Sequence, residues 1–67
     1  MSNLKILRAH KDMSQRELAE VSGVSIRMIQ YYEQGKNDIN RAEALTIYKL
    51  AKALDADMHQ LLELDEP

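Results

Sequence analysis

Apolar residues recur every three or four positions along the chain, the spacing that places side chains on one face of an α-helix. Leu4 and Leu7 share such a face in a first helix, expected over about residues 2–11. The longest run of this spacing lies in a fourth expected helix and consists of Ile47, Leu50, Ala51 and Leu54. The alternation of apolar and polar residues that is typical of strands is missing, so the pattern predicts an all-α protein.

Capping residues predict the bounds of the second and third helices. Ser14 followed by Glu17 is a capping box, in which each side chain accepts a backbone N–H at the helix start, and it predicts a helix over about residues 15–21. Gly23 can adopt the left-handed conformation that ends this helix. Ser25 is the expected cap of a third helix that ends near residue 34, before Gly35. These two helices are expected to bury Leu18, Ala19, Val21, Ile29 and Tyr32.

Two further caps complete the helical pattern. Asn40 is the expected cap of the fourth helix, and Asp57 is the expected cap of a short last helix that runs through Leu64. The last helix is expected to turn Met58, Leu61 and Leu62 inward. No repeat, linker or low-complexity segment separates the five helices, so we expect one compact domain over residues 1–67.

Composition excludes several classes of protein. No apolar run exceeds two residues, so we expect neither a membrane span nor a signal-peptide core, and we expect a cytoplasmic protein. Cysteine is absent, which excludes disulfides and thiolate sites. His10 and His59 have no partner at metal-ligand spacing, so both are expected at the surface. A chain this short leaves little room for an enclosed active site, and we expect no catalytic residue, metal, cofactor or small-molecule ligand.

Charge is distributed unevenly along the chain, although the net charge is only −2. Residues 1–54 carry nine basic and six acidic residues, whereas the acidic end, residues 55–67, carries five acidic residues and no Lys or Arg. A cationic body with an anionic end is compatible with binding a polyanion on one face. It is equally compatible with an ordinary soluble domain, so charge alone does not decide the function.

Residues 14–36 contain the features of a helix-turn-helix, with its two helices over about residues 15–34. Ala19 is small where the two backbones approach, and Gly23 supplies the turn between them. Val24 is expected to pack beneath the turn, and Ile29 is expected to anchor the second helix. All four residue types stand at the spacing that this motif requires.

Five segments in register with this motif resemble the phage-repressor-like helix-turn-helix family of DNA-binding proteins (Cro/repressor-type, or xenobiotic response element family). They are Leu4-Lys5-x-Leu7-Arg8, Ser14-Gln15-x-Glu17-Leu18-Ala19, Gly23-Val24-Ser25, Ile29-x-x-Tyr32-Glu33-x-Gly35-Lys36 and Leu50-Ala51-Lys52-Ala53-Leu54. The resemblance spans nearly the whole chain and implies a five-helix repressor-like fold that binds a double-stranded DNA operator. It also implies that residues 25–34 form a recognition helix that enters the major groove.

The resemblance places Ser25, Ile26, Arg27 and Tyr31 against base edges, and the helical spacing adds Gln30 to this outer face. Arg27 can pair with guanine O6 and N7, although it can also contact phosphate or remain solvated. Ile26 can pack on a thymine methyl group, or it can complete the core or an interface. Tyr31 and Gln30 can contact DNA or be plain surface residues.

Contacts with the DNA backbone are expected at both ends of the motif. Gln15 begins the second helix, whose free N–H groups attract anions, and the resemblance points to the same residue. Arg16, Lys36, Asn37 and Arg41 are the further candidates for phosphate contact. Residues 36–43 form a longer connection than in the common family pattern, so roles are carried over least directly there.

Two residues have structural roles that the resemblance implies. Arg8 and Glu33 correspond to a partly buried ion pair that holds the recognition helix against the first helix. Asp55 stands where the family often has a glycine after the fourth helix, and Asp adopts the left-handed conformation less readily than Gly.

The sequence therefore predicts a sequence-specific DNA-binding transcriptional regulator. Because one small domain makes few contacts, we expect a homodimer, at least on DNA, that uses the last helix and the acidic end with Leu61, Leu62 and Leu64. The alternative is a protein-interaction or antitoxin-like module that keeps the helix-turn-helix fold and binds its partner through Ile26, Met28 and Tyr31.

Overall fold

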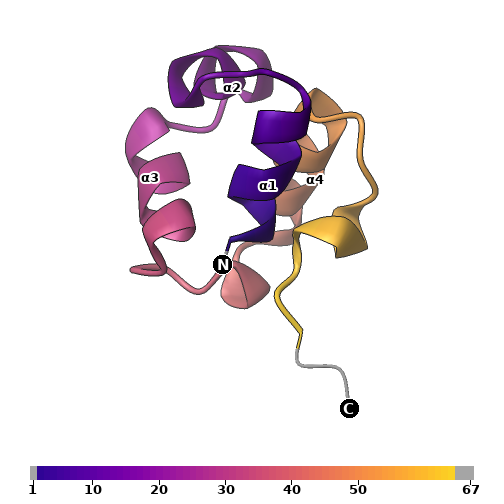
Figure 1. Cartoon of the computed structure of the whole chain (residues 1–67). Coiled ribbons are helices and arrows are strands. Elements are labelled where there is room, and N and C mark those ends of the chain that lie inside the picture. The colour runs from indigo at the N-terminus through magenta and orange to yellow at the C-terminus, as the bar shows by residue number, and fades with distance from the viewer. Residues whose placement is uncertain (1, 65–67) are drawn as a thin grey trace.

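The computed structural model describes residues 2–64, and the elements in this part of the chain are all helical (Figure 1). The α-helices are α1 (Asn3–His10), α2 (Gln15–Ser22), α3 (Ile26–Gln34) and α4 (Ala44–Ala53), and two 3-10 turns are η1 (Ile39–Arg41) and η2 (Met58–Leu61). The prediction of an all-α fold is therefore confirmed for the described residues. The predicted number of five helices is wrong, because the described part has four α-helices and its last helical element is a single 3-10 turn.

The local caps of α2 and α3 form as the sequence predicts. Ser14 N–H donates to Glu17 Oε1 at 3.0 Å, and Glu17 N–H donates to Ser14 Oγ at 3.0 Å, which completes the capping box. Ser25 Oγ accepts Met28 N–H at 3.1 Å. Both helices end at a glycine in the left-handed conformation, Gly23 and Gly35, each with a φ of 77°. The side chains of the two serines and the left-handed backbone of the two glycines fix where α2 and α3 begin and end.

The core gathers one apolar face from each helix. Its members are Leu4, Leu18, Val24, Ile29, Tyr32, Ile39, Ile47, Leu50, Ala51, Leu54 and Leu61. The predicted burial of Val21 is wrong, since its side chain is 62% exposed. The chain turns at Gly23 directly after α2, and Val24 rather than Val21 fills this end of the core.

The connection between α3 and α4 differs from the prediction. Helix α4 begins at Ala44, and its cap position is taken by Glu43, whose side chain makes no capping bond. Asn40 is therefore not the cap of α4. It lies within η1, where its backbone N–H donates to Asp38 Oδ1 at 3.0 Å, while Ile39 enters the core. This extra turn accounts for the length of residues 36–43.

The segment after α4 is also less helical than expected. Asp55 follows α4 in the left-handed conformation with a φ of 55°, as the position of the family glycine implies. Leu61 is fully buried and Leu62 half-buried, but Met58 is exposed and not turned inward, because η2 is only one turn long. Leu64 lies outside the helical turn and is 59% exposed. Met1 and the acidic residues Asp65 and Glu66, with Pro67, lie outside the described residues.

The helices pack so that α3 forms one side of the molecule (Figure 1). Helix α2 packs on α3 and on α4, while α1 packs on α3 and on η2. Only one face of α3 is used by these contacts, and the opposite face is left at the surface. Within residues 2–64, no helix has the length and apolar character needed to cross a membrane.

Candidate nucleic-acid interface

The buried face of α3 determines which of its side chains face solvent. Ile29 is fully buried and Tyr32 is buried beside it, while Val24 packs into the core just before the helix begins. Because an α-helix has 3.6 residues per turn, the residues on the side of α3 opposite to Ile29 and Tyr32 point outward. The outer face of α3 is defined here as Ser25, Ile26, Arg27, Met28, Gln30 and Tyr31.

The five residues expected to read bases all lie on this outer face, with different degrees of exposure. Ser25 and Arg27 are exposed. Ile26, Gln30 and Tyr31 are half-buried, so part of each side chain rests on the domain and part remains accessible. Met28, which the sequence singled out only for a protein partner, is 36% exposed on the same helix. The outer face of α3 is thus a mixed surface of one cation, hydrogen-bonding groups and apolar atoms.

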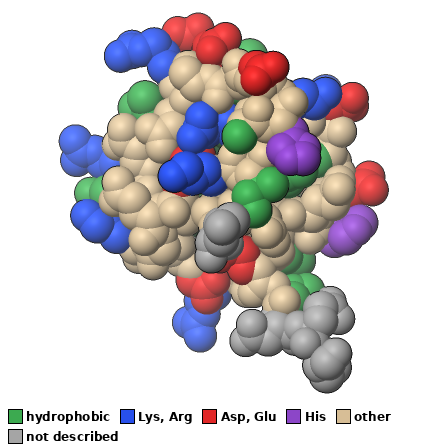
Figure 2. All heavy atoms as spheres, in the orientation of Figure 1, with side chains coloured by type: hydrophobic (Ala, Val, Ile, Leu, Met, Phe, Trp, Pro, Cys, Tyr) green, Lys and Arg blue, Asp and Glu red, His purple; other side chains and the backbone are tan. Residues whose placement is uncertain are grey.

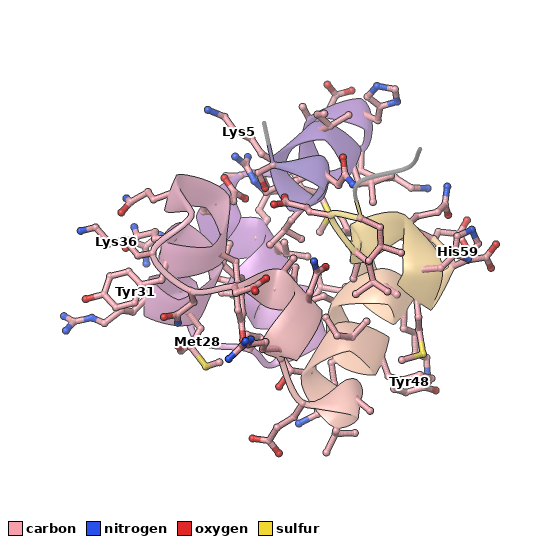
Figure 3. The ribbon with its side chains drawn as sticks, turned by 90° about the horizontal axis from the view of Figure 1, so that it is seen from below. Lys5, Met28, Tyr31, Lys36, Tyr48 and His59 are labelled. Atoms are coloured by element: carbon pink, nitrogen blue, oxygen red, sulfur yellow. The ribbon has the colours of Figure 1, made fainter. Side chains whose placement is uncertain are left out.

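Lys36 and Tyr31 form a contact at the C-terminal end of α3. The Lys36 ammonium lies 5.4 Å from the centroid of the Tyr31 ring, within the range of a cation–π interaction. Both side chains extend from this end of α3 away from the core (Figure 3). The contact places a positive charge beside the outer face of α3. It was not predicted, because the glycine turn at residue 35 breaks the helical spacing between the two residues.

Arg8 and Glu33, which the resemblance pairs, lie together between α1 and α3. Arg8 Nε donates to Glu33 Oε2 at 2.8 Å and Arg8 Nη2 to Glu33 Oε1 at 3.0 Å, a two-pronged contact. The side chains are 15% and 4% exposed, respectively. Hydrogen bonding to Glu33 raises the pKa of Arg8 above its ordinary value despite burial, which lowers it, and the charge of Glu33 adds to the rise. The guanidinium also donates to Met13 O at 2.7 Å.

Gln15 is joined to the same carboxylate. Its Nε2 donates to Glu33 Oε1 at 3.1 Å, so Glu33 connects α1, α2 and α3. A primary amide has two N–H groups, and one of them is used by this bond. The side chain of Gln15 is thereby held at the first turn of α2, where backbone N–H groups also point outward. Eighteen positions separate Gln15 from Glu33, so no sequence spacing indicated the contact.

The remaining candidates for phosphate contact precede and follow α3 in the chain. Arg16, Lys36, Asn37 and Arg41 are all exposed. The backbone N–H groups of Lys36 and Asn37 donate to Tyr31 O at 2.9 and 3.2 Å, which fixes the start of their loop against the helix end. Arg41 Nε lies 3.8 Å from Asp38 Oδ2, so its charge is partly offset in the free protein.

The outer face of α3 carries no exposed negative charge from the helix itself. Glu33 is the only acidic residue of α3, and its carboxylate is buried and paired with Arg8. Figure 2 shows Lys and Arg side chains on the side of the molecule that α3 forms. Residues 2–64 also contain no group of three or more potential metal ligands, and His10 and His59 are exposed as expected. The outer face of α3 is therefore accessible to an anion.

Comparison with known proteins agrees with this geometry. A search of curated proteins found no match to the chain. A family model described as helix-turn-helix matches residues 4–61, which is most of the chain and runs from the first turn of α1 to the end of η2. The match covers each of the segments that carry the resemblance seen in the sequence. The chain therefore belongs to the phage-repressor-like helix-turn-helix family of DNA-binding proteins.

Proposed function

We propose that this protein is a sequence-specific DNA-binding transcriptional regulator that inserts α3 into the major groove. The observation that supports this most is the outer face of α3, which projects Arg27 and has no exposed acidic side chain. A helix with such a face can approach the phosphates without repulsion and reach base edges.

The roles of individual residues follow from their places on that face. Arg27 is exposed near the start of α3 and is the candidate for a paired contact with guanine. Ile26 offers apolar surface to a thymine methyl group, while Ser25, Gln30 and Tyr31 supply hydroxyl and amide groups. Gln15 and Arg16 on one side, and Lys36, Asn37 and Arg41 on the other, are the candidates for phosphate contact.

The test is selection of bound duplexes from a random DNA library. The proposal predicts that one motif is enriched, and that Arg27→Ala relaxes the preference at one base pair at a cost of about 1–3 kcal/mol. Gln15→Ala serves as the matched control, because loss of a phosphate contact weakens all sequences alike. Failure to enrich any motif would contradict sequence-specific binding.

We further propose that two copies bind a two-fold related operator, since one copy buries little surface. The half-sites would lie about 34 Å apart, one turn of the DNA helix. Leu61 is in the core and is therefore not part of the dimer surface that the sequence suggested, whereas Leu64 stays available. Insertion of half a helical turn between the half-sites should abolish joint binding, as seen in gel-shift stoichiometry.

A protein-interaction module is the second candidate, and the exposure of Met28 favours it. Such a module would bind a partner through Ile26, Met28 and Tyr31. Salt distinguishes the two functions, because DNA binding weakens steeply with salt as counterions are released, while an apolar contact does not.

A further inference from the structure

The end of the described chain is held by the side chain of Asn40. Glu63 N–H donates to Asn40 Oδ1 at 2.8 Å, and Asn40 Nδ2 donates to Glu63 O at 2.9 Å. These are the two bonds that paired residues of neighbouring antiparallel strands exchange, with a side-chain amide in place of one strand. Asn40 therefore hydrogen-bonds the backbone of residue 63, and these bonds do not depend on the side chain at that position.

A second asparagine holds the same segment from the other end of the chain. Asn3 Nδ2 donates to Leu62 O at 2.7 Å, and Asn3 N–H donates to Glu63 Oε2 at 3.1 Å. Leu62 has an extended backbone, with φ −75° and ψ 146°. In Figure 1 the start of α1, η1 and the segment after η2 meet at one end of the molecule. Residues 62 and 63 thus form a brace between α1 and η1.

This brace is attached at the centre of the loop that carries the candidate phosphate contacts after α3. The loop is held to the end of α3 by the bonds from Lys36 and Asn37 to Tyr31 O, and Ile39, 3% exposed, anchors it in the core. Asn40 supplies the next attachment, directly before Arg41. Without the pairing to Glu63, the side chain of Asn40 would no longer attach the loop to the rest of the domain directly before Arg41.

We propose that Asn40 is a positioning residue for DNA binding, which uses the brace of residues 62 and 63 to fix the loop and hold Arg41 toward the DNA backbone. The inference rests on the proposed function. The paired bonds are exposed, so water can replace them and they add little to global stability. The two bonds instead keep the loop ordered. This order affects DNA binding, because a phosphate contact contributes less binding free energy when its side chain must first be ordered.

The first test uses the free full-length protein. In Asn40→Ala, the Glu63 amide should exchange with solvent about tenfold faster than in the parent, since its acceptor is gone, while the melting temperature changes little. Glu63→Ala is the matched control, because it removes the carboxylate that Asn3 uses but keeps both backbone groups that Asn40 uses. Unchanged exchange in Asn40→Ala would show that the pairing of Asn40 with Glu63 does not exist in solution and would overturn the proposal.

The second test measures binding to a selected duplex as a function of salt. Asn40→Ala should bind about tenfold more weakly at low salt, with a slope of log K against log salt that is shallower by about one, because one phosphate contact is lost. Arg41→Ala should show the same change, and the double variant should show no further one. Glu63→Ala should keep the parental slope.

The outcomes separate the two proposals. If the parent binds no DNA, the proposed function fails and the positioning role fails with it. The parent can bind DNA with salt dependence while Asn40→Ala keeps the parental slope and affinity; only the positioning role is then overturned. The same conclusion follows if the double variant loses the affinity of both single variants added together. Should Asn40→Ala not fold, Asn40→Ser replaces it: this variant adds no charge, its single short hydroxyl cannot form both bonds to Glu63, and it must show part of the same slope change.

Discussion

Glu33 is the residue through which three helices of this domain are joined. Its carboxylate accepts two hydrogen bonds from Arg8 of α1 and one from Gln15 of α2, while Glu33 itself lies on α3. A buried carboxylate is tolerated only when its oxygens are satisfied in this way. The tilt of α3 against α1, and the place of Gln15 at the start of α2, therefore depend on the same charged group.

Removal of one partner of this pair should be costly. Arg8→Met leaves the carboxylate of Glu33 buried without its counter-charge, and we expect a loss of about 3 kcal/mol in the free energy of unfolding. The double variant Arg8→Met/Glu33→Leu should recover most of that loss, because both charges are gone. Urea unfolding of the two variants and the parent tests this, and a single variant as stable as the parent would contradict the structural role of the pair.

At the scale of elements, the helix ends that depend on neighbouring residues were predictable from the sequence. The Ser14–Glu17 box and the glycines at 23 and 35 act through bonds and torsions within a few residues, and all three form. Asn40 was misassigned because its partner, Glu63, lies twenty-three positions away. The burial of Val24 was predicted and is confirmed, but the sequence did not show that Val21, three positions earlier, stays exposed, because this depends on how α2 packs on the other helices.

The end of α4 offers a test of backbone strain. Asp55 has a φ of 55°, where an L-residue is disfavoured and glycine is not, and its side chain forms an exposed ion pair with Lys11 at 3.7 Å. We expect Asp55→Gly to raise the free energy of unfolding by up to about 1 kcal/mol. Asp55→Ala is the control, because it removes the charge but keeps the strain. Equal effects of the two variants in thermal unfolding would show that conformation is not the cause.

The capping box of α2 predicts part of the acid sensitivity of the fold. The Ser14 backbone N–H, which donates to the Glu17 carboxylate, and secondarily the Ser14 hydroxyl lower the pKa of Glu17 below its ordinary value of 4.5. Since the folded state then holds this proton less tightly, the box adds stability above that value and loses it as pH falls through the lowered pKa.

Glu17→Gln removes this titration and should therefore lose less stability than the parent between about pH 7 and about pH 3. Urea unfolding at a series of pH values measures the difference. Parallel pH profiles for the two proteins would mean that the carboxylate of Glu17 does not contribute.

At the scale of the whole molecule, α3 presents its apolar side to the core and its other side to solvent. The sequence predicted this division from the spacing of Ile29 and Tyr32, and both are buried. What it could not predict are the contacts that arrange the surface around α3, such as Lys36 over Tyr31 and Gln15 on Glu33, because these depend on tertiary geometry. The arrangement of the helix-turn-helix was thus predictable from the sequence, whereas the contacts on its surface were less so.

Insertion of the outer face of α3 into DNA can be followed by titrating the labelled protein with a selected duplex and recording every backbone amide by NMR. We expect the largest shifts at residues 25–31 and at Gln15. We expect the amides of the exposed face of α4, which carries Leu45 and Tyr48, to stay unchanged. Large shifts on α4 with an unaffected α3 would contradict insertion of α3 into the DNA.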